Sequence, residues 1–392
     1  MSANIYLEGG GESKELHIRC REGFRKLLEK AGFKGRLPRL TACGGRDAAF
    51  GDFQTGHATK GDSDLECRGR NREWGLKMRI PIPCIAVLLT SFTTLHAAEA
   101  PKPLKVFILA GQSNMEGQGL IAAEPKRNDG KGSLEYLVKN LDTAERFKHL
   151  VDEAGKWRVR EDVWIWYLDR HGPMTVGYGA KPDRIGPELG FGHVVGDALD
   201  NLVLLIKCAW GGKSLAKDFR PPSSGGEVGP YYTQLVQLAK DVLARLKELF
   251  PAYDGRGYEL AGFGWHQGWN DRINQAFNDE YEKNLANFIR DIRRDLGTPR
   301  LPFVIAETGM SGFEEKHPRA LSLMKAQAAA AEYPEFIGNV AFAGTKAFWR
   351  AQEQSPGGQG YHWNTNAETY YLIGEATGRA MLQLLAAPAQ GR

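Results

Sequence analysis

From Pro101 onward, short apolar runs alternate with longer amphipathic stretches. Five runs of strand length are almost continuously apolar, as strands buried on both faces of a parallel sheet are. They cover Leu104–Ala110, Leu202–Lys207, Leu260–Trp265, Pro302–Ala306 and Ile337–Phe342. Stretches of helical character cover Leu189–Leu199, Tyr231–Phe250, Asp279–Leu296, Leu321–Glu332 and Ala367–Leu385. This alternation predicts an α/β domain over residues 104–385, in which a central parallel sheet lies between two layers of helices.

A different pattern precedes this domain. Met78-Arg79 is followed by an apolar run over residues 80–95 and by the small residues Ala97 and Ala98. A basic start, an apolar run and small residues are the pattern of a secretory signal peptide. The run is shorter than the about 20 apolar residues of a membrane span. A buried core segment or an uncleaved anchor is the alternative. We expect a signal peptide over residues 78–98, a secreted or periplasmic protein, and no stable membrane insertion after cleavage.

The 77 residues before Met78 have a character of their own. Ile5–Glu12 predicts a strand that enters a Gly-rich turn, and Leu16–Ala31 predicts a basic helix. Residues 1–55 resemble the start of a small bacterial family of unknown function with Toprim-like features, cut off before its fold could close. We interpret residues 1–77 as a truncated unrelated segment, or as an extension produced by a misplaced start codon, with Met78 as the true start.

Composition narrows the possible partners. The chain is 42% hydrophobic and 25% charged, as soluble globular proteins are. The net charge of +4 is small, and much of the basic excess lies in the first eighty residues, so we expect no nucleic-acid partner. The five cysteines lack C-x-x-C spacing, and no histidine cluster completes a zinc set. We therefore expect no metal, no organic cofactor and no disulfide framework.

Candidate chemistry gathers where the predicted strands end, because sites of parallel α/β sheets lie at the carboxyl ends of the strands. The first strand is followed by Gly111-Gln112-Ser113-Asn114-Met115-Glu116-Gly117. A serine at such a strand-to-helix turn is held toward solvent as a nucleophile. A helix cap or tight-turn former is the ordinary alternative for this serine.

Three later segments supply matching groups. Gly211 and Gly212 follow the second strand and let backbone N–H groups approach a developing oxyanion. Gln267 follows the third strand and offers a side-chain N–H to the same anion. His362, before the last helix, offers an imidazole as general base. His266 is better explained as a packed strand-end residue than as a second base.

Together these motifs are recognisable. G-Q-S-N-M, A-W-G-G-K-S-L, W-H-Q-G-x-x-D and G-Y-H-x-N-x-N-A-E-T-Y occur in the order found in the sialate O-acetylesterase and acetylxylan esterase group of SGNH hydrolases, which this chain resembles over about residues 104–382. The resemblance implies a flavodoxin-like three-layer α/β/α sandwich. It also implies that Ser113 is the nucleophile, that His362 is the base, and that Ser113, Gly211 or Gly212, and Gln267 supply the oxyanion hole.

Two departures from the family pattern affect the base. Many relatives carry an aspartate three residues before the histidine, where this chain has Gln359. The usual Q-G-E-S-D is here Gln267-Gly268-Trp269-Asn270-Asp271. The group that orients His362 is therefore a backbone carbonyl or a carboxylate from elsewhere. Asp271 is the candidate carboxylate, and a loop anchor is its alternative role.

Several residues are candidates for substrate binding. Trp269 or Trp363 is expected to face a sugar ring, and Trp164 and Trp166 to be structural. Arg220, on a long loop after the second strand, could meet the carboxylate of an acidic sugar, although a structural salt bridge suits it slightly better. Gln112 and Asn114, beside the nucleophile, complete the candidate set.

The sequence thus predicts a secreted serine esterase that removes O-acetyl groups from an acetylxylan-like polysaccharide or an O-acetyl sialic acid. A non-catalytic carbohydrate-binding protein on an esterase fold is one alternative. A short-chain lipase or thioesterase of the same superfamily is the other. The sequence contains no feature that predicts an oligomeric state.

Overall fold

The computed structural model describes residues 2–7, 14–19 and 101–387. Residues 1–91 and 92–392 form separate units. In the first, β1 (Ser2–Leu7) pairs with β2 (Lys14–Arg19) as an antiparallel hairpin. The strand predicted from Ile5 is confirmed up to Leu7, whereas the helix predicted from Leu16 is wrong over residues 16–19. Leu16 and Ile18 alternate with polar residues, and this period of two suits a strand. The proposed signal peptide lies outside the described residues.

The second unit is built on a sheet in the order β11-β10-β9-β3-β8-β5-β6. All neighbouring strands are parallel except β5 and β6, which form an antiparallel pair at one edge. The strands cover Leu104–Gly111 (β3), Arg160–Tyr167 (β5), Arg170–Met174 (β6), Val203–Ala209 (β8), Tyr258–His266 (β9), Phe303–Ala306 (β10) and Val340–Ala343 (β11). The central parallel sheet expected from the apolar runs is therefore confirmed, and β6 is the antiparallel addition.

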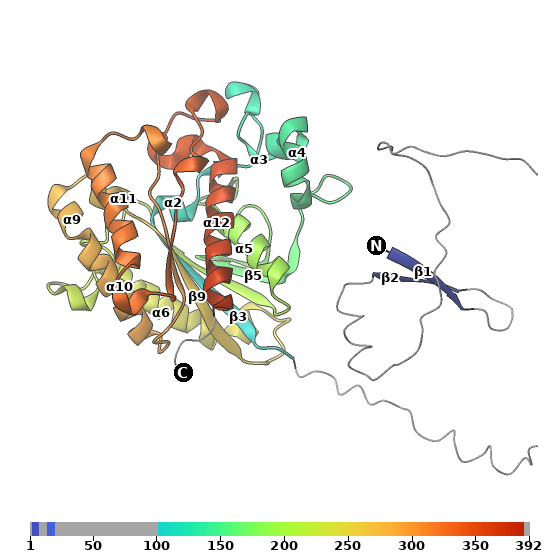
Figure 1. Cartoon of the computed structure of the whole chain (residues 1–392), viewed down its shortest axis with the longest axis horizontal. Coiled ribbons are helices and arrows are strands. Elements are labelled where there is room, and N and C mark those ends of the chain that lie inside the picture. The colour runs from blue at the N-terminus through green and yellow to red at the C-terminus, as the bar shows by residue number, and fades with distance from the viewer. Residues whose placement is uncertain (1, 8–13, 20–100, 388–392) are drawn as a thin grey trace, which may run out of the picture. The chain divides into compact units, whose positions relative to one another are not determined.

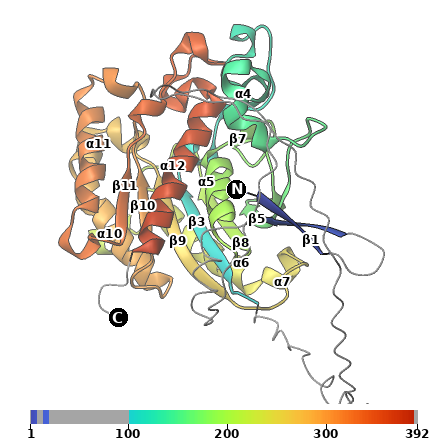
Figure 2. The ribbon, with the colours of Figure 1, turned by 45° about the vertical axis from the view of Figure 1, so that its right-hand side comes forward.

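Helices cover both faces of this sheet (Figure 1). One face packs against α6 (Pro230–Ala244), α10 (Tyr281–Asp295) and α11 (Pro318–Ala331). The other packs against α5 (Pro187–Ala198) and α12 (Ala367–Ala386), which also pack on each other (Figure 2). The three-layer α/β/α architecture is confirmed.

Apolar spacing explains these layers. In α10, Leu285, Phe288, Ile289 and Ile292 recur at the spacing of one helical face and are completely buried. In β3, Val106, Ile108 and Ala110 belong to one core cluster, while Phe107 and Leu109 belong to the other. Because successive strand residues point to opposite faces, one apolar run fills both cores.

Shorter elements surround the edge of the sheet where the strands end. The short helix α7 (Leu246–Leu249) is an exception, because it lies at the opposite edge, between α6 and the start of β9 (Figure 2). The elements at the carboxyl edge are α2 (Ser113–Glu116), α3 (Leu134–Lys139), α4 (Leu141–Phe147), α8 (Trp269–Arg272), α9 (Gln275–Asp279) and the small antiparallel pair β4 (Gly119–Leu120) and β7 (Arg184–Ile185). A 3₁₀ segment over Gly360–Thr365 leads into α12. These elements form the rim on which the candidate chemistry lies.

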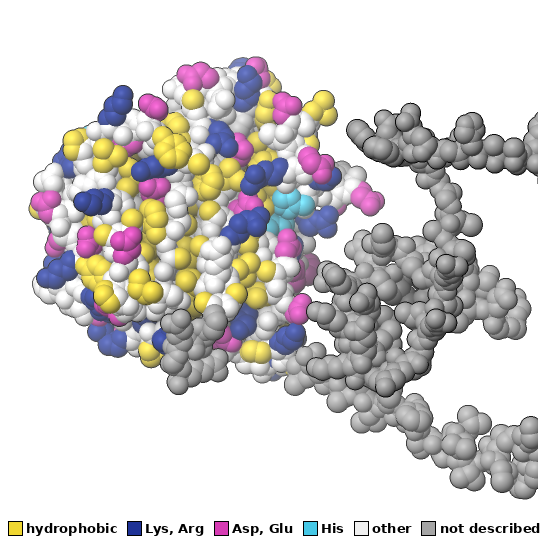
Figure 3. Space-filling model, viewed as in Figure 1, with side chains coloured by type: hydrophobic (Ala, Val, Ile, Leu, Met, Phe, Trp, Pro, Cys, Tyr) yellow, Lys and Arg dark blue, Asp and Glu magenta, His cyan; other side chains and the backbone are white. Residues whose placement is uncertain are grey.

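The surface of this domain carries mixed charge. Lys and Arg side chains alternate with Asp and Glu side chains over the face seen in Figure 3. None of the helices in the described part of the chain is long and apolar enough to cross a membrane.

Candidate active site

The register of the sheet brings three loops to one edge. Gly111, the last residue of β3, lies opposite Ala209 of β8 and His266 of β9. The segments that follow these residues begin at the same level. β3 is also where the strand order reverses, since β8 lies on one side of it and β9 on the other. Sites of open α/β sheets form at such switch points.

Ser113 begins α2 at this point, 9% exposed, and its side chain makes no hydrogen bond within the described residues. The turn before it is tight. A Cβ added to Gly111 would lie 2.1 Å from the carbonyl oxygen of His266, so only glycine fits. The close approach of β3 to β9 therefore places the serine at the carboxyl edge of the sheet, as the sequence predicts.

The side chains of the residues on either side of Ser113 point into the protein. Gln112 donates from Nε2 to Asn270 Oδ1 (3.0 Å), and its Oε1 accepts the Gly268 N–H (3.2 Å). Asn114 donates from Nδ2 to the Tyr361 carbonyl (3.0 Å), and its Oδ1 accepts the Tyr370 hydroxyl (2.7 Å). The structure does not place either amide as a free substrate-binding group, because neighbouring loops use both.

His362 lies in the segment before α12 and is partly buried. Burial and, second, the positive charge of Arg184 lower the pKa of its imidazole to about 4. Its ring makes no hydrogen bond to any described residue, Ser113 and Asp271 included. The backbone of its segment is nevertheless joined to the Ser113 turn through Asn114, which brings the predicted nucleophile and base to neighbouring loops.

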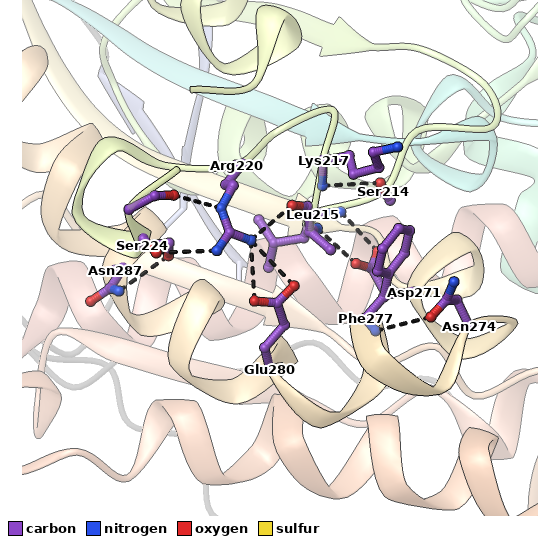
Figure 4. A network of polar contacts seen from close by, with 12 residues as sticks. Ser214, Leu215, Lys217, Arg220, Ser224, Asp271, Asn274, Phe277, Glu280 and Asn287 are labelled. Carbon is purple, nitrogen blue, oxygen red and sulfur yellow. Dashed lines mark hydrogen bonds and ion pairs between the residues drawn. The ribbon is translucent and has the colours of Figure 1, made fainter. Parts of the chain in front are cut away.

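Asp271 has a different role from the one predicted for it beside His362. Its carboxylate is fully buried and accepts the N–H groups of Leu215 and Ala216, both at 2.8 Å, and the Gln267 side chain at 2.6 Å. Burial raises its pKa to about 7, although these three hydrogen bonds lower it. The contacts support the loop-anchor role (Figure 4), and none of them is with His362.

Gln267 belongs to the same buried network. Its Nε2 donates to Asp271 Oδ2 and to the Lys213 carbonyl (2.9 Å), and its Oε1 accepts the Tyr281 hydroxyl (3.1 Å). Both amide protons are therefore engaged, so the structure does not support the prediction that Gln267 is an oxyanion donor.

The glycines after β8 fit that role better. A Cβ on Gly211 would lie 3.8 Å from Ser113 Cβ and 3.1 Å from Glu116 Oε2, so Gly211 faces the nucleophile. The Glu116 carboxyl group also lies beside Gly211, and nothing in its sequence position pointed to this place. Its burial raises the pKa of the carboxyl group, while the Gly211 N–H and Lys207 oppose the rise. Gly212 has open space around its Cα and a φ of 72°.

Lys207 is a second residue that sequence reasoning missed. This β8 side chain is completely buried, and its Nζ donates to Glu188 Oε2 (2.7 Å) and to the carbonyls of Glu116 and Tyr178 (both 2.6 Å). It thereby ties the end of α2 to α5. A lysine within a continuous apolar run was the signal that could have revealed it.

One of the two candidate tryptophans borders the site. The Trp269 ring is partly exposed and lies 5.8 Å from the Tyr361 ring, which lies 4.4 Å from the His362 ring. The Arg272 guanidinium lies 4.2 Å above Trp269. Trp363 is instead completely buried, so the prediction that it faces substrate is not supported. Trp164 and Trp166 are buried, as expected.

Arg220 is turned into its own loop. Its guanidinium donates to the carbonyls of Ala216, Ser224 and Gly225 and pairs with Glu280 at 3.1 Å (Figure 4). These contacts support the structural salt bridge, which the sequence favoured slightly, and do not support the substrate-binding prediction, because most donors of the guanidinium are occupied within the protein.

The chain is similar to several known proteins. A probable carbohydrate esterase of Arabidopsis thaliana is 24% identical over 219 residues, which are 55% of this chain and 73% of that protein. A solved Arabidopsis structure aligns with a TM-score of 0.47 and 17% identity, over 72% of this chain and 98% of that one. A carbohydrate acetylesterase from Xanthomonas citri aligns with a TM-score of 0.44 and 13% identity, over 70% and 55%.

The family model for carbohydrate esterases described as sialic acid-specific acetylesterases matches residues 103–383. This match spans the whole sheet, the Ser113 turn, the His362 segment and most of α12. The chain therefore belongs to this carbohydrate esterase family.

Proposed function

We propose that the protein is a serine esterase that removes O-acetyl groups from a carbohydrate, with Ser113 as nucleophile and His362 as general base. The observation that carries the proposal is the position of Ser113 at the switch point of the sheet, beside a histidine segment hydrogen-bonded to the adjacent Asn114. A nucleophile and an imidazole on neighbouring loops are the parts that acyl transfer requires.

The reaction proceeds in two steps. His362 takes the proton of Ser113 Oγ while this oxygen bonds to the acetyl carbonyl carbon. The tetrahedral intermediate then expels the sugar oxygen, which leaves with that proton and generates acetyl-Ser113. Water, deprotonated by His362, attacks this ester and releases acetate, and the proton returns to Ser113.

Backbone N–H groups stabilise the oxyanion. Those of Ser113 and Gly212 are the donors that we assign, since the Gln267 amide is engaged elsewhere and the Gly211 N–H is hydrogen-bonded to the Glu116 carboxyl group. Loss of one such donor costs about 3 kcal/mol of transition-state stabilisation in comparable sites. The burial of Ser113 supports this assignment, because hydrogen bonds to an oxyanion are stronger where water is excluded.

Two aromatic side chains near His362 support a sugar as the alcohol part of the ester. Trp269 and Tyr361 lie in contact distance beside His362, and Tyr361 is 41% exposed. Flat aromatic faces with polar edges suit the apolar faces of sugar rings. Acetylated xylan and O-acetyl sialic acid both remain within this proposal.

Secretion is part of the proposal and rests on the pattern at residues 78–98. N-terminal sequencing of the protein released by expressing cells tests it. A mature N-terminus near Ala98 is the expected result, and a mature protein that retains residues 1–77 would contradict it.

The esterase is tested with p-nitrophenyl acetate, a longer p-nitrophenyl ester, acetylated xylan and O-acetyl sialic acid. We expect acetate release from at least one carbohydrate, preference for the short ester, and a loss of about 10⁴-fold or more in Ser113→Ala. Equal rates for wild type and Ser113→Ala would reject the esterase, and preference for the long ester would reject the deacetylase.

A further inference from the structure

His362 occupies a segment whose backbone is unfavourable. Trp363, Asn364 and Thr365 have φ angles of 51°, 54° and 57°, and a left-handed conformation is particularly rare for a β-branched residue such as Thr365. Such a conformation persists only where surrounding contacts determine it. The contacts that hold this segment are therefore the ones that decide where the base lies.

No side chain of the described residues fixes the imidazole by a hydrogen bond, and its ring contact is with Tyr361, 4.4 Å away. Neither ring nitrogen of His362 has a hydrogen-bond partner among the described residues, and Gln359 stands where a carboxylate would suit this purpose. The residue is held by its main chain instead. Its N–H donates to the Gln359 carbonyl (2.8 Å), and its carbonyl accepts the Tyr370 hydroxyl (3.2 Å).

The Tyr370 hydroxyl also hydrogen-bonds to Asn114, the residue that follows Ser113. It lies 2.7 Å from Asn114 Oδ1 and 3.2 Å from the His362 carbonyl oxygen, so its single proton is shared between these two acceptors and bridges the residue next to Ser113 and the His362 segment. The Asn114 amide makes a second link, from Nδ2 to the Tyr361 carbonyl at 3.0 Å. Tyr370 is completely buried and Asn114 is 3% exposed, so water does not compete for these bonds.

We propose that Asn114 and Tyr370 form a clamp that holds the His362 segment against the Ser113 turn and positions the base without a carboxylate behind it. The proposal rests on the proposed function. Tyr370 projects from α12, which is packed on α5, so the clamp connects the site to a rigid element. Both are positioning residues, because they act through the backbone and touch no reacting atom.

The adjacent tyrosine provides a matched control. Tyr371 is also buried, and its hydroxyl lies 2.8 Å from His149 Nε2, away from the two loops. Tyr370→Phe and Tyr371→Phe each remove one buried hydroxyl from the same helix. We expect Tyr370→Phe to lower kcat for acetyl ester hydrolysis about 10- to 100-fold with KM within twofold, and Tyr371→Phe to leave both unchanged.

A double-mutant cycle tests whether Tyr370 acts through Asn114. Asn114→Ala removes both links and should lower kcat further than Tyr370→Phe does. The loss in the double variant should be smaller than the product of the two single losses, because without Asn114 the hydroxyl keeps only its bond to the His362 carbonyl and no longer joins the two loops. Additive losses, or equal kcat in wild type and Tyr370→Phe, would overturn the clamp.

Hydrogen exchange tests the clamp without turnover. Tyr370→Phe should increase amide exchange in the peptide covering residues 359–366, and Tyr371→Phe should not. Wild-type protein without esterase activity would reject the proposed function, whereas the exchange measurement would still decide the clamp. Unchanged exchange in Tyr370→Phe would overturn the clamp even in an active enzyme.

Discussion

Two polar loops at the same edge of the sheet use hydrogen bonding in opposite ways. In the loop after β9, Gln267 and Asp271 are buried and all their contacts are made within the protein. In the segment before α12, the His362 ring makes no hydrogen bond to any described residue, and its ring contact, Tyr361, is exposed. A polar side chain whose hydrogen bonds are satisfied supports the scaffold, and one without hydrogen bonds has its nitrogens available for chemistry.

The largest effect that tests this comparison is expected from removal of the proposed base. His362→Gln keeps a polar side chain of similar reach but cannot take the Ser113 proton, so kcat should fall about 10³-fold. Circular dichroism and the urea midpoint should stay at wild-type values, since the ring makes no hydrogen bond. Retained activity in this variant would assign the base to another residue.

A substitution in the loop after β9 should instead lower the stability of the fold. Asp271→Ala leaves the N–H groups of Leu215 and Ala216 and the Gln267 amide without their acceptor, which should lower the free energy of unfolding by about 3–5 kcal/mol. Urea denaturation measures the loss. Asp279→Ala, at an exposed aspartate, is the control and should change little. Loss of kcat at unchanged stability would place Asp271 in the chemistry after all.

The pH dependence of the reaction sharpens the assignment of the base. Neutral imidazole is the active form, and its pKa is lowered to about 4. The acid limb of kcat/KM should therefore lie near pH 4, with activity kept as pH falls through 6.5 and lost about tenfold per pH unit below 4. His193→Gln is the control, because burial lowers the pKa of His193 to about 4 as well, outside the site. A limb near 6.5, or one that moves in His193→Gln, would contradict the assignment.

The smallest effect is expected at Arg220. Arg220→Met removes the pair with Glu280 and the bonds to its own loop, which should cost about 1–2 kcal/mol of stability. KM for an acidic acetylated sugar should stay within twofold of wild type. A rise in KM for acidic substrates alone, measured against a neutral acetylated sugar, would restore the substrate-binding role.

The sequence was sufficient for the parallel core of the sheet and for the position of the Ser113 turn at its carboxyl edge. Apolar runs predict β3, β8, β9 and β10, because a strand buried on both faces has no polar side to interrupt it. The β5–β6 hairpin was not predicted, since Arg160, Glu161 and Asp162 open β5 with charge. Ser113 was singled out because its turn follows a predicted strand and its G-Q-S-N-M motif, with the three later motifs, resembles the esterase family.

The roles of the other polar residues could not be predicted, because their partners are far away in sequence. Asn114 meets Tyr370 across 256 positions, and Asp271 meets Ala216 across 55. A motif shows which residue types stand at a strand end. It does not show whether an amide there points to substrate or to a distant loop, and this explains the outcomes for Gln112, Asn114 and Gln267.

The dependence of the site on α12 has a consequence for the synthesis of the protein. Ser113 lies near the start of the domain, whereas the base and Tyr370 belong to its last segment and last helix. On the proposed mechanism, a growing chain that has already formed β3, β8 and β9 carries the nucleophile without its base. Hydrolysis would then begin only when α12 has left the ribosome and packed on α5, and the protein would stay inactive through most of its own translation.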